Sequence, residues 1–342
     1  MIFGALSSSF LLFGIVLLYG VGANPEVWGA SFPGSEARDA LSFDYLGDLI
    51  RENPDHLLLR TGIVLIIAGI AFKIGAAPFQ IWVPDVYHGS PMPITAFLSV
   101  SSKAAGFFVL LNLVNGPFAG AKDFLLPLLG FVATFTIFFG NLAACAQRNI
   151  KRMLGLSGVA HAGYLLVAIM ASMIFPGDSD RAVWVLFFYM FVYLIASFSV
   201  FGVMSLADLK DDNEHEFADY ENLARKHPLL GFALVCGIGS LAGIPPFAGF
   251  ISKLLLVSVA LEAGLYFSLA AMIIGVVISI YYYFGWVREI TFHPRPVFDD
   301  DEPKHDPWNK LSEIGVIKFV LITLTVVSLV FGIWQGPFGD TF

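Results

Sequence analysis

Three lysines lie inside stretches that are otherwise apolar enough to cross a bilayer, namely Lys73, Lys103 and Lys253. A charge at membrane depth is costly, so an ionisable residue there is a candidate functional site. A lysine can carry a proton and release it when its surroundings change, because desolvation and nearby charges alter the balance between its two protonation states. Three such residues in one chain therefore indicate a path for protons or other ions.

Lys103 lies deepest. It is ten residues past the proline at the start of its span, which at about 1.5 Å per helical residue puts it roughly 15 Å into a hydrocarbon core about 30 Å thick. Lys253 follows the Pro-Pro pair at 245–246, where unwound carbonyls and water would lower the cost of its charge. Lys73 comes shortly before Pro78. The competing interpretation is structural, with each lysine bound permanently to carbonyls or a carboxylate, or snorkelling to an interface.

His161 is the histidine that falls within an apolar span. Imidazole gains and loses a proton near neutral pH, which suits a relay between two lysines. A single histidine in an apolar helix is more often a packing residue. The buried lysines favour the relay, because a relay here would have two groups to connect. Asp85 and His88 lie in the expected cytoplasmic loop at 84–92, between the second and third spans, and form either a proton uptake point or a solvated turn.

The composition predicts a polytopic membrane protein. The chain is 57% hydrophobic and 13% charged, against about 25% charged in an ordinary soluble domain. Its net charge of −8 lies mostly in the loops and gives no indication of nucleic-acid binding. Cys145 and Cys236 lack the paired spacing of a metal or redox site, and the acidic run at 299–306 is typical of a solvated loop. We therefore expect neither a metal nor a cofactor.

We expect an all-α fold of about nine transmembrane helices forming one proton-translocating domain over 1–342. The segments FKIGAAPFQIW and GIPPFAGFISK each combine a lysine, small residues and Pro-Phe, which is typical of interrupted helices in an inverted-repeat transporter. On that basis 1–207 would hold the end of the first repeat and the start of the second, and 208–342 the remainder and the final helix. The expected spans are 1–23, 58–77, 93–115, 124–145, 155–176, 182–207, 228–262, 265–287 and 316–336, with breaks after Lys73 and within the seventh.

Three segments then resemble the subunit N family of bacterial NADH–quinone oxidoreductase, respiratory complex I, whose members belong to the antiporter-like membrane subunits. They are FKIGAAPFQIWVPDVYHGSPMPITAFLSVSSKAAGF, NIKRMLGLSGVAHAGYLLVA and SLAGIPPFAGFISKLLL. The resemblance implies a subunit without a redox group of its own that moves protons in the bacterial inner membrane, in contact with lipid and other membrane-arm subunits. By motif, Lys73 is similar to the lysine that pairs with a glutamate, Lys103 to the central lysine, His161 to the relay histidine and Lys253 to the distal lysine.

Measured against that family, we expect the sequence to lack roughly the first five helices, including the glutamate that partners Lys73. Two alternatives follow. The chain could be a subunit of a multisubunit cation/proton antiporter, which shares the fold and is driven by an ion gradient. It could also be a fragment that does not transport.

The basic residues predict a cytoplasmic N-terminus and an outward C-terminus. The expected loops on the side of the N-terminus hold ten of them, namely Arg148, Lys151, Arg152, Lys210, Arg225, Lys226, Arg288, Arg295, Lys304 and Lys310, against Arg38, Arg51, Lys122 and Arg181 on the other side. Positively charged loops stay in the cytoplasm.

Single cysteines test this orientation. In a background without Cys145 and Cys236, Ser31→Cys and Asp212→Cys should react with an impermeant maleimide from opposite faces of the membrane, with Ser31→Cys labelled from outside. Labelling of Ser31→Cys from the cytoplasm alone would reverse the predicted topology.

Overall fold

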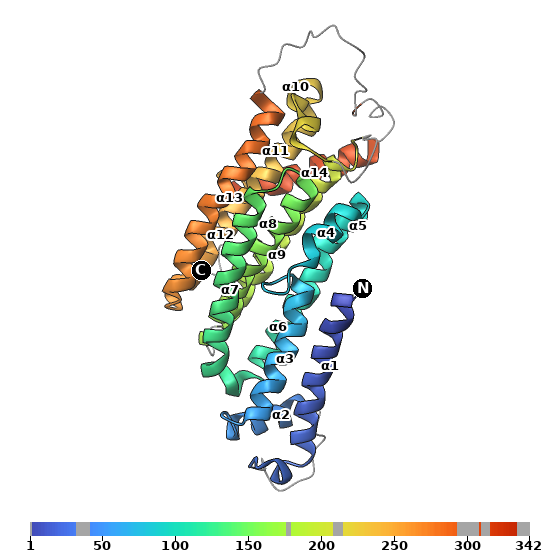
Figure 1. Cartoon of the computed structure of the whole chain (residues 1–342). Coiled ribbons are helices and arrows are strands. Elements are labelled where there is room, and N and C mark those ends of the chain that lie inside the picture. Colours follow the sequence, from blue (N-terminus) through green and yellow to red (C-terminus); the bar gives the residue numbers. More distant parts are fainter. Residues whose placement is uncertain are drawn as a thin grey trace.

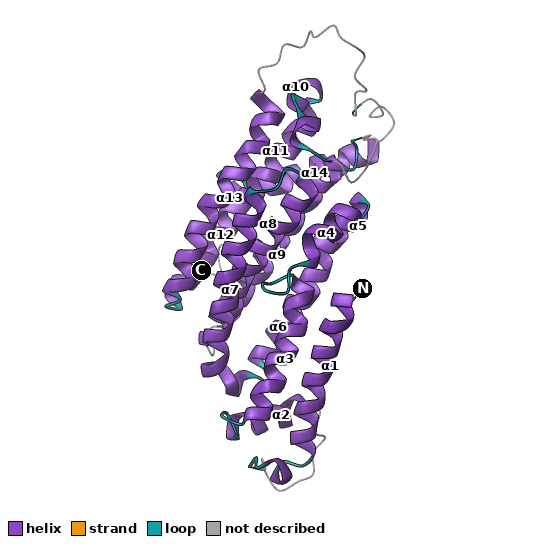
Figure 2. Ribbon diagram, in the orientation of Figure 1, coloured by secondary structure: helices purple, strands orange, loops and turns teal. Residues whose placement is uncertain are grey.

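The structure, a computed structural model, describes residues 2–31, 42–175, 179–207, 215–292, 308 and 315–333. These residues form helices and connecting loops, without β-strands apart from an isolated bridge between Asn149 and Glu216 (Figure 2). The expectation of an all-α protein is confirmed.

The helices follow one another along the chain with short connections. They are α1 (Ile2–Ala23), α2 (Phe43–Glu52), α3 (Leu57–Ile74), α4 (Trp82–Gly89), α5 (Met92–Phe97), α6 (Lys103–Asn115), α7 (Lys122–Cys145), α8 (Ile150–Ile174), α9 (Ser179–Met204), α10 (Leu223–Lys226), α11 (Pro228–Ala242), α12 (Ala248–Glu262), α13 (Tyr266–Phe292) and α14 (Gly315–Ile333). The π-helical segment Leu98–Ser102 joins α5 to α6.

Eight helical segments among the described residues are long and apolar enough to cross a membrane, and each matches one of the expected spans. The expected span at 228–262 is the exception, because it is divided into α11 and α12. Helix α8 starts at Ile150, five residues before the expected 155, because the Asn149 side chain accepts a hydrogen bond from the Arg152 backbone and caps the helix. Hydropathy alone misses that turn because it is charged.

Helix α8 is the centre of the bundle. It packs against α4, α6, α7, α9, α12 and α13, and every residue from Met153 to Met173 is buried. Figure 1 shows it enclosed by the green to orange helices, while α1 lies at the edge beside α3. An uninterrupted apolar helix buried on all sides is the natural carrier of a site that must exclude bulk water.

Two helices are broken with the same local geometry. Helix α3 ends at Gly75, with φ of 75°, and α11 ends at Gly243, with φ of 78°. Both glycines are followed by x-x-Pro-Phe. In each break the glycine N–H and the next N–H bond back into the helix, as in Schellman caps. Figure 1 shows α12 continuing beyond α11, and α4 beyond α3. Both expected interruptions are confirmed, while the division of repeats at residue 207 stays a prediction.

The expectation of a loop at 84–92 is wrong. Residues Trp82–Gly89 form α4, which packs on α8. The segment resembles a turn because of its Pro84 and Gly89, but Pro84 lies in the first turn, where its missing N–H costs no helical hydrogen bond.

Helix packing around α8 depends on small residues, which a glycine substitution can test. A Cβ at Gly140 would lie 2.5 Å from Ala160 N and 2.8 Å from Leu156 O, both backbone atoms. Gly140→Ala should therefore destabilise the protein by about 1–3 kcal/mol through overpacking. Gly285→Ala is the control, since no heavy atom lies within 4 Å of the place its methyl group would take, and it should be neutral or stabilising by up to about 1 kcal/mol. Thermal unfolding in detergent compares the two, and equal melting temperatures would contradict the packing argument.

Candidate functional site

Lys103 is buried inside the bundle. It follows directly after the π-helical segment, an irregularity often found at functional sites. Its side chain is 4% exposed, and Nζ has no hydrogen-bond partner among the described residues. Nζ lies 6.0 Å from the Tyr87 ring centroid and 5.9 Å from that of Tyr193. The faces of two tyrosines thus replace a carboxylate in stabilising an ammonium.

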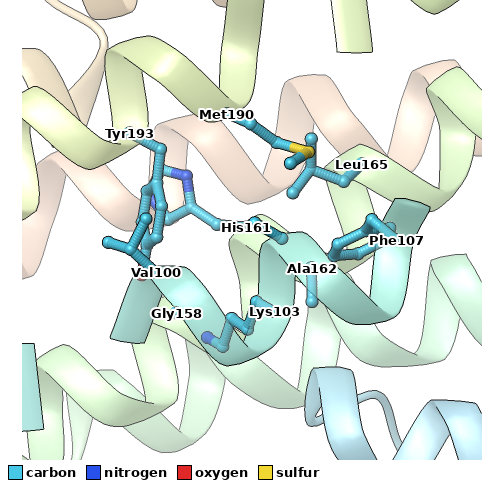
Figure 3. A pocket seen from close by; sticks show the side chains of 10 residues that line it. Val100, Lys103, Phe107, Gly158, His161, Ala162, Leu165, Met190 and Tyr193 are labelled. Atoms are coloured by element: carbon cyan, nitrogen blue, oxygen red, sulfur yellow. The ribbon is translucent and has the colours of Figure 1, made fainter. Parts of the chain in front are cut away.

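Space for this amine comes from Gly158 on α8. A Cβ there would lie 2.5 Å from Lys103 Nζ and 2.9 Å from the Tyr193 hydroxyl. Lys103 also borders a cavity of about 10 Å³ that it shares with His161, Met190 and Tyr193, near the lower limit for one water molecule. Figure 3 shows Lys103 and the rings of His161 and Tyr193 around this cavity.

His161 borders two cavities. Beyond the first, it lines a second of about 10 Å³ together with Tyr189, Tyr193, Ser240 and Lys253. Its Nδ1 lies 2.8 Å from the Tyr189 hydroxyl, and its ring is 4.9 Å from that of Tyr193. The imidazole is therefore oriented by a hydroxyl and stands between the cavities of the two lysines.

The amine of Lys253 has hydrogen-bond acceptors, whereas that of Lys103 has none among the described residues. Its Nζ donates to the carbonyls of Leu241 and Ala242, at 2.9 and 2.8 Å, in the last turn of α11. A cation is favourable at the carbonyl end of a helix. The break at Gly243 supplies the room, because a Cβ there would lie 2.5 Å from Lys253 Cδ. The broken helix thus creates a buried site for a charge.

Three of the predicted residues are therefore brought together. Lys103, His161 and Lys253 come from α6, α8 and α12, and His161 shares one cavity with each lysine. Among the described residues no aspartate or glutamate is buried. Positive charge on all three groups at once would be opposed by mutual repulsion at low dielectric. Amine and imidazole groups so placed favour one shared proton over several at once.

Lys73 lies apart from this group. It is exposed on the outer face of α3, near its C-terminal end. Its predicted role in proton transfer stays a prediction.

The suggested uptake point is also separate. Asp85 is 69% exposed and forms an ion pair with Arg152 at 3.0 Å, which ties α4 to the start of α8. His88 is half-buried on the same short helix. The buried Tyr87 lies between this surface and Lys103, and its hydroxyl has no partner among the described residues.

Sequence reasoning misses Lys151 and the tyrosines. It places Lys151 in a loop, yet this residue is completely buried, and its Nζ donates to Ser90 O at 2.7 Å. The sequence does hold one indication of this burial. Lys151 lies seven residues before Gly158, which is two helical turns along the same face of α8. Tyr189 and Tyr193 carry a weaker signal, the i, i+4 spacing on one apolar helix.

The residues suited to bind metals are scattered. Among the ranges that the structure describes, no group of three or more His, Cys, Asp or Glu side chains could hold an ion.

Comparison with known sequences gives consistent matches. The profile of the NADH:quinone oxidoreductase/Mrp antiporter transmembrane family matches residues 1–279. NADH-quinone oxidoreductase subunit N 1 of Opitutus terrae is 50% identical over 340 residues, covering 99% of this chain and 65% of the relative. Subunit N of Heliobacterium modesticaldum is 35% identical over 342 residues, again with 65% of the relative covered. The chain thus spans about two thirds of the length of these relatives.

Solved structures show the same fold. A chain of respiratory complex I from Thermus thermophilus with bound aureothin is 29% identical, with a TM-score of 0.72, over 98% of this chain and 66% of that one. A chain of the Mrp complex from Dietzia sp. has a TM-score of 0.75 over 96% of this chain and 63% of that one, at 19% identity. At that identity the second likeness concerns the fold alone.

The different bonding of the two lysines predicts opposite effects on stability. Lys253→Met leaves the Leu241 and Ala242 carbonyls without this donor and should cost about 1–3 kcal/mol. Lys103→Met removes a buried amine that has no partner among the described residues, and should be neutral or stabilising. Unfolding of the purified protein in detergent compares them. A greater loss for Lys103→Met would show that Lys103 has a stronger partner than the two tyrosine rings.

Proposed function

The chain belongs to the NADH:quinone oxidoreductase/Mrp antiporter transmembrane family, and on this basis we propose that it is a proton-translocating membrane-arm subunit of an NADH–quinone oxidoreductase. The names of its relatives, subunit N and subunit N 1, support the pump rather than the antiporter. The chain is a multi-pass membrane protein, and the bacterial inner membrane is its location.

One observation carries the mechanism, namely that His161 borders both the Lys103 cavity and the Lys253 cavity. A proton on Lys103 would reach the imidazole through a water molecule in the first cavity, with Tyr193 beside it. The imidazole would then deliver a proton into the second cavity and onward to Lys253. An imidazole can accept at one nitrogen and release from the other, so the ring need not move far.

The two ends of this path hold a proton differently. The ammonium of Lys253 has two carbonyl acceptors, whereas that of Lys103 has only aromatic faces among the described residues. Transfer from Lys103 to Lys253 is therefore downhill in hydrogen bonding, and a change in surroundings must reset the site. In a pump that reset would come from the redox reaction in partner subunits.

In this proposal the chain has no redox group and no catalytic activity by itself. Quinone reduction takes place in other subunits of the enzyme, and this chain contributes the proton path. Its exposed apolar side chains on α1, α13 and α14, among them Leu12, Val277, Tyr281 and Phe319, suit contact with lipid and with neighbouring membrane subunits.

The cation/proton antiporter is the alternative function, and one measurement separates the two. Membranes containing the assembled complex should acidify the vesicle lumen on addition of NADH, without a requirement for sodium. Proton movement that depends on a sodium gradient, and is indifferent to NADH, would favour the antiporter.

Lys103 provides the direct test. In the assembled complex, Lys103→Ala should reduce NADH-driven proton pumping several-fold. Lys103→Arg should fail as well, because a guanidinium stays charged at every relevant pH. Lys226→Ala is the matched control, since this lysine is exposed on α10 and should be dispensable. Pumping is measured as the proton-to-electron ratio in inverted vesicles. An unchanged ratio in Lys103→Ala would refute the proposed role, and normal pumping by Lys103→Arg would show that Lys103 supplies a fixed charge.

A further inference from the structure

A second buried polar group lies between α7, α8 and α13, and the proton path above does not use it. It consists of Asn141, Ser157, Tyr164, Tyr282 and Tyr283, each at most 5% exposed. The Tyr282 hydroxyl donates to Asn141 Oδ1 at 3.2 Å, and Asn141 Nδ2 donates to the Tyr164 hydroxyl at 3.2 Å. Ser157 and Tyr283 share a hydroxyl–hydroxyl hydrogen bond. This group forms a polar line across a helix interface that is otherwise apolar.

The orientation of the Asn141 amide is determined by its surroundings. Its Nδ2 also donates to the backbone carbonyl of Ile137 at 2.9 Å. A carbonyl can only accept, so the nitrogen must face Ile137 and the oxygen must face Tyr282. Both amide hydrogens are used, one on Ile137 and one on Tyr164. The side chain is consequently locked with a single polarity.

The line of hydroxyls approaches the proton path at one end. Lys253 Nζ lies 5.6 Å from the centroid of the Tyr164 ring, and the His161 ring lies 5.7 Å from it. At the other end, the rings of Tyr282 and Tyr283 lie 4.6 Å apart. Half-buried Cys145 ends α7 one helical turn after Asn141 and lies near Tyr282. The loop that follows Cys145, at 146–149, is predicted to be cytoplasmic. Asn141 thus stands between the Tyr282 hydroxyl and Tyr164, whose ring lies beside Lys253 and His161.

An amide is a poor element for proton transfer. A hydroxyl or a carboxyl accepts a proton on one side while it releases another, whereas an amide would have to pass through a protonated or imidic acid form. Both of its hydrogens remain on nitrogen in the hydrogen-bonding role seen here. Asn141 therefore joins Tyr282 and Tyr164 by hydrogen bonds without letting a proton cross.

Close packing leaves little room for water beside the amide. A Cβ at Gly275 would lie 2.8 Å from the Tyr164 hydroxyl and 2.9 Å from Asn141 Nδ2. A Cβ at Gly163 would lie 2.6 Å from Ile137 Cγ1, and one at Gly140 within 2.5 Å of the Ala160 backbone. Backbones approach this closely only where little free space remains. The gap between Tyr164 and Tyr282 is filled by Asn141 itself.

We propose that Asn141 is a proton barrier, which keeps protons on the side of Tyr282 and Tyr283 from reaching the Lys253 and His161 site. This inference rests on the proposed function, since a barrier is needed only beside a proton path. Asn141 itself transfers no proton. It supplies the polar partners that Tyr164 and Tyr282 require inside the membrane, and it separates them with respect to proton transfer.

A matched pair of substitutions at Asn141 tests the barrier without turnover. Asp at this position could bind a proton on one oxygen, from the Tyr282 side, and release one from the other oxygen toward Tyr164. Leu fills similar space but transfers nothing. In proteoliposomes with the assembled complex, without NADH and under a potassium diffusion potential, Asn141→Asp should raise passive proton flux several-fold over wild type. Asn141→Leu should leave this flux unchanged. An enclosed pH dye reports the flux.

Two further variants locate the leak and guard against misfolding. Asn141→Asp combined with Tyr282→Phe should return the flux to the wild-type level, because the hydroxyl that feeds the carboxyl is gone. If the Asp variant fails to assemble, Asn141→Thr and Asn141→Val make the same comparison with side chains of equal shape, and the Thr variant should leak more. Equal flux in the two members of the pair, raised or not, overturns the barrier.

The flux measurement is independent of the pumping test. Failure of the proposed function would appear as normal NADH-driven pumping in Lys103→Ala. Failure of the barrier would appear as equal passive flux in the paired Asn141 variants while Lys103→Ala still loses pumping.

Discussion

The cost of placing an ammonium group inside a membrane, with no carboxylate among the described residues to offset it, is the constraint on which this structure depends. The ammonium of Lys253 is stabilised by the carbonyls in the last turn of α11. These carbonyls are free to accept because the helix is broken at Gly243. Lys103 meets it through two tyrosine faces and a gap that Gly158 leaves open. The two lysines are thus stabilised in different ways, and in the proposed path this difference would set the direction of transfer.

Helix α8 carries the residues that make room for these charges. Its glycines permit a lysine to lie against it at Gly158 and α7 to pack closely at Gly163, while its His161 faces the cavities. Small cavities and close-packed contacts therefore lie around a single buried helix.

Much of this can be predicted from the sequence, because intramembrane charges and helix-breaking residues are rare and each has few explanations. Lys103, His161 and Lys253 are found that way, as are both helix breaks. The exposure of Lys73 is not predicted, since hydropathy says little about which face of a helix points inward. The burial of Lys151 is not predicted either, because its charged turn lies outside the apolar span. The Asn141 group gives no signal at all, because tyrosine and asparagine are ordinary residues at helix interfaces until their partners are known.

A proton pump needs barriers to proton leakage as well as a path. Inside a membrane both involve buried polar groups, which are costly unless they are hydrogen-bonded. Hydroxyl, imidazole and amine groups can each accept and release a proton, and such groups line the two cavities around His161. The amide of Asn141 forms the same kinds of hydrogen bond with Tyr164 and Tyr282, so it satisfies the helix interface equally well. Its difference lies only in chemistry, because its protons stay on nitrogen. One buried side chain can therefore stabilise the contact of α7, α8 and α13 and still separate the interior site from the surface.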